Sequence, residues 1–91
     1  MGLNIVVETV AGLEHPKWDT VRRGPDRQIA DIIKSLPALG DTDFEGDPII
    51  RPSDFAAWKE AAPEDSGTRS RYLDLVGILE AEPEYWVVLS Y

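Results

Sequence analysis

The only histidine of the chain lies in the segment best suited to acid–base chemistry. His15 is followed by Asp19, Arg22 and Arg23. A histidine beside a carboxylate can act as a general base, and neighbouring arginines can hold an anion. These residues therefore allow a small enzyme or an anion-binding domain. The structural alternative is that the charged side chains of residues 19–27 form surface ion pairs, which contribute little stability each.

Other catalytic and metal-binding patterns are missing from the sequence. The chain has no cysteine and one histidine, which excludes disulfides and thiolate metal sites and leaves a histidine zinc site short of ligands. The common glycine-rich, serine-hydrolase and metalloprotease motifs are also absent. The sequence therefore predicts no metal, no cofactor and no assigned catalytic residue.

A second candidate for chemistry is the acidic run that begins at Asp41. Together with Asp43, Glu45 and Gly46 it resembles the front half of an EF-hand calcium loop, with oxygen side chains at alternate positions before a glycine. The closing position, which needs a bidentate Glu, holds Pro52. We therefore expect calcium to bind weakly or not at all. The run is interpreted as a solvated acidic loop or a segment that docks a partner.

The net charge of the protein lies entirely in its second half. Residues 1–40 hold five acids and five bases, whereas residues 41–91 hold 12 acids and four bases, which accounts for the whole net charge of −8. The acids gather in residues 41–47, 60–65 and 80–84. Such a field repels nucleic acid and anionic membranes and favours a basic protein surface. A solvated surface that keeps the protein soluble is the simpler alternative.

These features favour a small acidic protein-binding domain over an enzyme. The predicted partner-binding residues are Trp18, Asp41, Asp43, Glu45, Asp47, Glu80, Glu82 and Glu84. Trp18 is included because a tryptophan in a polar loop could be an exposed interface anchor. In size, acidity and missing catalytic motifs the chain resembles phage-carried acidic inhibitors, such as anti-CRISPR and anti-restriction proteins. That resemblance implies an inhibitor, or an immunity-type partner, of a basic protein.

The length and composition predict one α+β domain covering residues 1–91. Hydrophobic residues make up 43% of the chain, which is enough for one core. The start of the chain lacks the pattern of a signal peptide, and no apolar run is long enough to cross a bilayer. A cytoplasmic protein without membrane contact is the resulting expectation.

Both ends of the chain are expected to form strands that pair with each other. Residues 3–9 and 85–91 are rich in β-branched and aromatic side chains, with apolar residues on both faces. Unpaired, each would be an aggregation-prone edge. A third, short strand over residues 17–22 is possible. The sheet should pack against about three helices.

The middle of the chain is expected to contain the helices. The first begins near Pro25 and carries an apolar stripe of Ile29, Ile32, Ile33 and Leu36. The second is capped by Ser53, and the third begins at Ser66 or Thr68 and buries Tyr72, Leu75, Val76 and Leu79. Gly77 interrupts the third helix, and close packing against a neighbour is its expected reason. Residues 37–52, with three prolines, are expected to form a long loop with a brief extended piece at Ile49 and Ile50.

Overall fold

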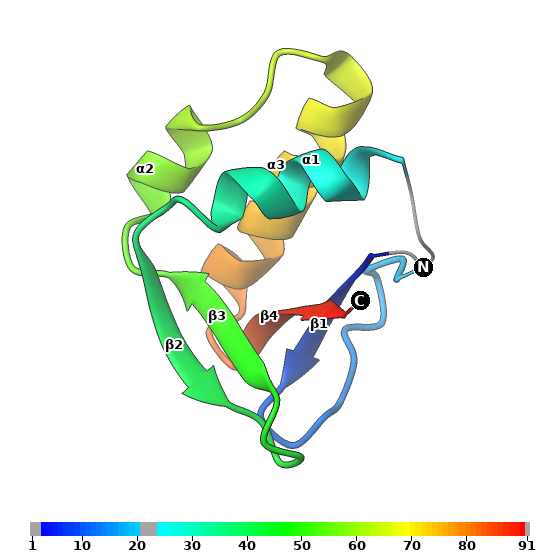
Figure 1. The fold of residues 1–91 in the computed structure, drawn as a ribbon, viewed down its shortest axis with the longest axis vertical. Coiled ribbons are helices and arrows are strands. Elements are labelled where there is room, and N and C mark those ends of the chain that lie inside the picture. Colours follow the sequence, from blue (N-terminus) through cyan, green and yellow to red (C-terminus); the bar gives the residue numbers. More distant parts are fainter. Residues whose placement is uncertain (1–2, 21–23, 91) are drawn as a thin grey trace.

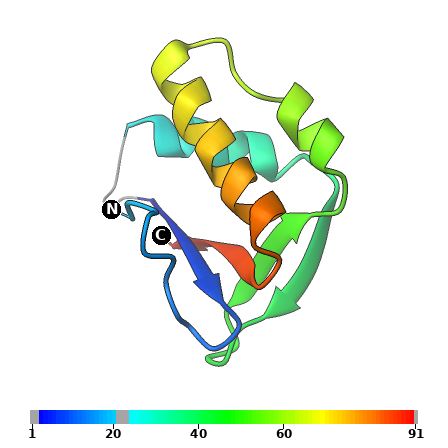
Figure 2. The same ribbon diagram turned by 180° about the vertical axis from the view of Figure 1, so that it is seen from behind.

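The computed structural model describes residues 3–20 and 24–90, which form an α+β fold (Figure 1). Its strands are β1 (Asn4–Thr9), β2 (Ala38–Thr42), β3 (Pro48–Pro52) and β4 (Tyr85–Ser90), and its helices are α1 (Pro25–Ile33), α2 (Phe55–Glu60) and α3 (Ser66–Ala81). The strands form one antiparallel sheet in the order β1-β4-β3-β2. The helices lie together on one side of this sheet, as the opposite view also shows (Figure 2).

The pairing of the two terminal strands is confirmed. β1 and β4 run antiparallel, from Asn4 opposite Ser90 to Thr9 opposite Tyr85. The face of the pair that meets the helices carries Ile5, Val7 and Val87, all fully buried. The alternating pattern of apolar residues therefore fixes both the register and the buried face of the two strands.

The expectation of a long loop over residues 37–52 is wrong, because this segment forms the hairpin of β2 and β3. The extended piece expected at Ile49 and Ile50 is confirmed, since both residues lie in β3. At its turn the backbone N–H of Asp43 donates to the carbonyl of Asp47 at 2.9 Å, and the N–H of Gly46 donates to the carbonyl of Asp43 at 3.0 Å. Gly46 has a φ of +85°, the left-handed conformation expected of the glycine that closes a three-residue hairpin loop. The acidic run is therefore a hairpin turn.

The possible third strand at residues 17–22 does not form in residues 17–20, while residues 21 and 22 lie outside the described residues. The neighbouring segment instead covers the outer edge of β1. The N–H of His15 donates to the carbonyl of Val7 at 2.8 Å, and the N–H of Thr9 donates to the carbonyl of Leu13 at 3.0 Å. An irregular segment thereby supplies the partners that a further strand would have supplied.

The predicted helical stripes form the core. Tyr72, Leu75, Val76 and Leu79 of α3 are fully buried, against Trp58 of α2 and Ile29 and Ile33 of α1. Of the predicted stripe of α1, Ile32 is only partly buried, and so is Leu36, which lies beyond the end of the helix at Ile33. The caps of α2 and α3 are Asp54 and Asp65, whose carboxylates accept from Ala57 and Thr68, so the predicted Ser53 cap is wrong.

The explanation expected for Gly77 is also wrong. A Cβ at this position would have no heavy atom of the described residues within 4 Å. Gly77 instead faces a hollow of about 550 Å³ between α3 and the segment that contains His15 and Trp18. Close packing therefore does not account for a glycine in the middle of α3.

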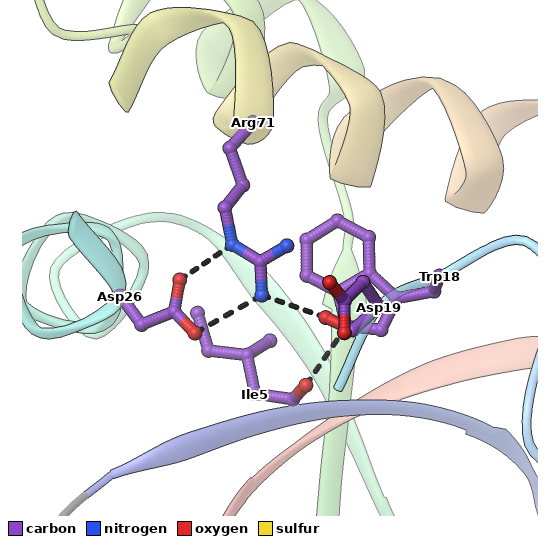
Figure 3. A network of polar contacts seen from close by, with 5 residues as sticks. All are labelled: Ile5, Trp18, Asp19, Asp26 and Arg71. Carbon is purple, nitrogen blue, oxygen red and sulfur yellow. Dashed lines mark hydrogen bonds and ion pairs between the residues drawn. The ribbon is translucent and has the colours of Figure 1, made fainter. Parts of the chain in front are cut away.

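A buried ion pair joins α1, α3 and the segment before α1 (Figure 3). Arg71 of α3 donates through Nε to Asp26 Oδ1 at 2.6 Å and through Nη2 to Asp26 Oδ2 at 3.0 Å. Nη2 also donates to the carbonyl of Asp19 at 2.9 Å. The guanidinium lies 4.1 Å from the ring centroid of Trp18, whose Nε1 donates to the carbonyl of Ile5 at 2.8 Å. One side chain thereby connects two helices, a loop and the edge of the sheet.

Truncation of Leu79 to alanine is expected to cost about 2–5 kcal/mol of unfolding free energy, the usual loss for a fully buried leucine. Leu89→Ala in β4 should cost less, because Leu89 is only partly buried beside the core. Urea denaturation of both variants measures the difference. Equal losses would show that Leu89 is as much a core residue as Leu79.

Removal of the carboxylate by Asp26→Ala is expected to lower the unfolding free energy by about 3–5 kcal/mol, because it leaves the mostly buried guanidinium of Arg71 unpaired. The matched control is Glu80→Ala, which breaks a pair with Lys59 in which both side chains are about half exposed. The control should lose less than about 1 kcal/mol. Similar losses in the two variants would contradict a structural role for the buried pair.

Candidate protein-binding surface

The predicted acidic residues fall into two separate groups in the structure. Asp41, Asp43, Glu45 and Asp47 lie at the β2–β3 hairpin, and Glu80, Glu82 and Glu84 lie where α3 ends and β4 begins. The second group is engaged within the chain. Glu80 pairs with Lys59 at 2.7 Å, Glu82 Oε2 lies 2.5 Å from His15 Nε2, and the charge of Glu84 acts on Arg51. Glu80 and Glu82 therefore already pair with side chains of the chain itself, whereas Glu84 acts on Arg51 only through its charge.

The hairpin turn is docked on the turn that follows β1. The N–H of Phe44 donates to the carbonyl of Val10 at 2.9 Å. A Cβ built on Gly12 would lie 2.3 Å from Cε1 of Phe44, and Gly12 has a φ of +88°. The backbone conformation therefore favours glycine at this position, and any side chain there would displace the Phe44 ring. The two ribbon views agree that the two turns lie side by side (Figures 1 and 2).

Three large apolar side chains are exposed where these turns meet. Val10 is 43% exposed, Leu13 is 68% exposed and Phe44 is 64% exposed, and all belong to the two docked turns. Acidic side chains lie in the same region: the charges of Asp43, Glu14 and Glu45 all act on Glu8 of β1. We call this the tip surface: it comprises Val10, Leu13 and Phe44 with Glu8, Glu14, Asp43 and Glu45.

The two most buried acids of the tip surface have opposite pKa shifts. Burial raises the pKa of Glu8 to about 7, with further contributions from its hydrogen bond to Asp43 and from the charges of Asp43, Glu14 and Glu45. For Asp43, burial opposes ionisation, but hydrogen bonds from Asp47, Glu8 and the turn backbone outweigh it and lower the pKa. Asp43 is therefore the ionised acceptor, and Glu8 holds the proton between them.

Asp43 also builds the turn itself. Its Oδ1 accepts the backbone N–H groups of Glu45 and Asp47, each at 2.9 Å, and the residue is only 8% exposed. The oxygen that an EF-hand-like loop would offer to calcium is thus occupied by the backbone. Within residues 3–20 and 24–90, no three histidine or acidic side chains are placed to share a metal ion.

The prediction that Trp18 is an exposed anchor is wrong. Trp18 is only 8% exposed, because its ring lies against Arg71 and its indole N–H donates to the carbonyl of Ile5. Trp18 is therefore buried by contacts with Arg71 and Ile5, both distant from it in the sequence. The exposed aromatic residue in the described part of the chain is instead Phe44.

His15 has both ring nitrogens engaged. Nδ1 accepts the N–H of Lys17 at 3.1 Å, so Nε2 carries the proton and donates to Glu82 at 2.5 Å. The side chain is 5% exposed, and its ring meets Tyr85 edge-on. A base needs a free lone pair, which this arrangement does not offer. The other residues predicted for this site are Asp19, Arg22 and Arg23. The backbone carbonyl of Asp19 accepts a hydrogen bond from Arg71. Arg22 and Arg23 lie outside the described residues.

Several residues of the tip surface were not predicted from the sequence. Val10, Leu13 and Phe44 were not identified, nor were the two acids Glu8 and Glu14. One local signal was available, since Phe44 is the only apolar side chain within the acidic run of residues 41–47. The meeting of two turns more than thirty residues apart, through Phe44 and Val10, had no local signal.

Comparison of the chain with protein-family models, with curated proteins and with solved structures finds no significant match in any of the three. Among the described residues, no helix combines the length and apolarity needed to cross a membrane. The surfaces of the chain therefore carry the functional inference.

Replacement of Glu8 by glutamine is expected to change how stability depends on pH. The pKa of Glu8 is raised from 4.5 to about 7 on folding. Between these two pH values the folded state binds more protons at Glu8 than the unfolded state does. The protonated Glu8 therefore contributes its full stabilisation below pH 4.5, less as the pH rises, and none above pH 7. Relative to the parent, Glu8→Gln should thus be more stable at pH 8 than at pH 5. Urea denaturation at both pH values, with Glu64→Gln as an exposed control, makes the comparison. A parent-like pH profile for Glu8→Gln would contradict the raised pKa.

Proposed function

We propose that this chain is a binding protein whose tip surface docks on a basic protein, and that it has no catalysis of its own. The observation that carries the proposal is the gathering of Val10, Leu13 and Phe44, all exposed, among four acids. Protein interfaces commonly combine an apolar, aromatic-rich centre with a polar rim. An exposed apolar cluster of this kind marks an interaction site more often than a scattered apolar residue does.

The way Phe44 is held supports a role as the anchor of that interface. Its backbone is fixed by the hydrogen bond to Val10 and by the turn bonds of Asp43, and its ring is seated over Gly12. A side chain already fixed in place loses little entropy when it binds. Aromatic anchors in the centre of an interface are the residues whose truncation costs most affinity.

The acids of the tip surface define the chemistry of the partner. Glu14, Asp43 and Glu45 are carboxylates whose charges all act on Glu8. A partner with lysine or arginine around an apolar hollow would complement this surface. Together with the net charge of −8, this disfavours nucleic acid and anionic membranes as direct partners. More specifically, this chain would act in the cytoplasm as an inhibitor, or as an immunity-type partner, of such a basic protein.

Phe44→Ala is expected to weaken partner binding by about 2 kcal/mol or more, as for an interface anchor. Glu45→Lys should chiefly slow association, and the parent's association rate should fall as salt rises, because screening shortens the field to about 8 Å at physiological ionic strength. Asp43 is left unchanged because it builds the turn. The partner is first captured from cells of the source organism and then measured by surface plasmon resonance at low and high salt.

Glu64→Lys is the matched control, because it reverses an exposed acid just before α3, outside the tip surface. It should bind like the parent. If Phe44→Ala and Glu45→Lys also bind like the parent, the tip surface is not the interface and the proposal fails. If all charge reversals weaken binding equally, only the overall charge matters.

A further inference from the structure

The two edge strands of the sheet differ in how their outer backbone is covered. On β1, the carbonyls of Ile5 and Val7 accept from Trp18 Nε1 and His15 N–H, and the N–H of Thr9 donates to Leu13. The carbonyl of Thr9 accepts from Gly12. This edge is therefore closed by the segment that follows it, and a further strand has no access to it.

The outer edge of β2 is open. In an antiparallel hairpin, hydrogen-bonded and non-hydrogen-bonded residue pairs alternate along the ladder. Because Asp43 bonds to Asp47, the next hydrogen-bonded residues of β2 are Asp41 and Leu39, whose N–H and C=O groups point to β3. The N–H and C=O groups of the residues between and beside them point outward, away from β3: these residues are Ala38, Gly40 and Thr42. The N–H of Thr42 donates to the Asp41 carboxylate at 2.8 Å. In the described part of the chain, no hydrogen bond is made by the outward groups of Ala38 and Gly40.

β2 also lacks the usual protection of an exposed edge. All five of its residues are exposed, and the strand contains no lysine, no proline and no bulge. A Cβ at Gly40 would meet nothing within 4 Å among the described residues. The only charge on the strand is that of Asp41. Such an edge can pair with another extended segment, provided that the segment's charge is compatible.

Charge decides which segment that is. A second copy of this chain would bring another net charge of −8 against the acidic hairpin, which opposes self-pairing. A segment with lysine or arginine at alternate positions would place a cation opposite Asp41 and near the acids of the turn. β2 leads directly into the turn that carries Phe44, so one partner could contact both.

We propose that β2 accepts an extended, lysine- or arginine-bearing segment of the partner as an additional antiparallel or parallel strand. The inference rests on the proposed function for the basic character of the partner, and it adds the means of recognition. Main-chain hydrogen bonds at Ala38 and Gly40 hold the segment, and Asp41 selects its charge.

The test uses a defined probe, the acetylated and amidated peptide Lys-Val-Lys-Val-Lys-Val-Lys, with ¹⁵N-labelled protein. We expect chemical-shift changes along β2 and slowed hydrogen exchange of the Ala38 and Gly40 amides. Gly40→Pro removes an outward N–H without touching the ladder to β3 and should abolish these effects, whereas the matched Gly40→Ala should keep them. Asp41→Lys should weaken binding at least tenfold, which gives a second readout if Gly40→Pro fails to fold.

The outcomes separate this inference from the proposed function. The peptide Lys-Pro-Lys-Pro-Lys-Pro-Lys has the same charge but cannot pair as a strand; equal binding of this control would overturn the inference. So would absence of binding by the valine peptide, or self-association of the protein through β2. Shifts confined to Val10, Leu13 and Phe44 would overturn the strand inference while leaving the tip surface as the interface.

Discussion

The arrangement of this protein depends on the buried pair of Asp26 and Arg71. A carboxylate with no exposed surface must have a cationic partner, and Arg71 satisfies it with two hydrogen bonds. The same guanidinium binds the carbonyl of Asp19 and lies against Trp18, so the segment before α1 is held beside α3. Trp18 in turn binds the carbonyl of Ile5 and closes part of the β1 edge. The covering of one sheet edge is therefore a consequence of a charge buried between two helices.

The β2–β3 half of the sheet is joined to β4 by few backbone contacts, and the reason lies in the sequence of β3. Its backbone groups that face β4 belong to Pro48, Ile50 and Pro52, and the two prolines have no N–H to donate. Accordingly, the ladder between β3 and β4 has a single paired position, Ile50 opposite Val87. The hairpin is held at two further places. Arg51 donates to the carbonyls of Leu79 and Pro83, each at 2.7 Å, and the turn docks on Val10. These contacts hold the hairpin against the rest of the protein, which the single paired position between β3 and β4 could not do alone.

Local periodicity predicted the terminal strands and the three helices because burial of one face leaves a regular pattern in the sequence. It failed over residues 37–52, where prolines suggested a loop although they occupy positions that do not donate to β2. It failed again at Trp18, whose burial depends on Arg71, far away in the sequence. The acidic residues were identified as candidates for binding, but their roles depend on contacts that no local pattern shows. Phe44 and Val10, which contact each other in the structure, lie 34 residues apart in the sequence.

The structure divides the acidic residues by what each one already binds. Asp54 and Asp65 cap helices, Asp26 neutralises Arg71, and Asp43 holds the hairpin turn. Each of these carboxylates accepts hydrogen bonds from donors within the chain. At the tip surface, in contrast, the acids lie close to one another. Burial, the hydrogen bond to Asp43 and then the charges of Asp43, Glu14 and Glu45 raise the pKa of Glu8 to about 7. A cation placed beside these charges would be attracted by all of them. The strength of such a local field depends on where the carboxylates gather, which the net charge of the chain does not reveal.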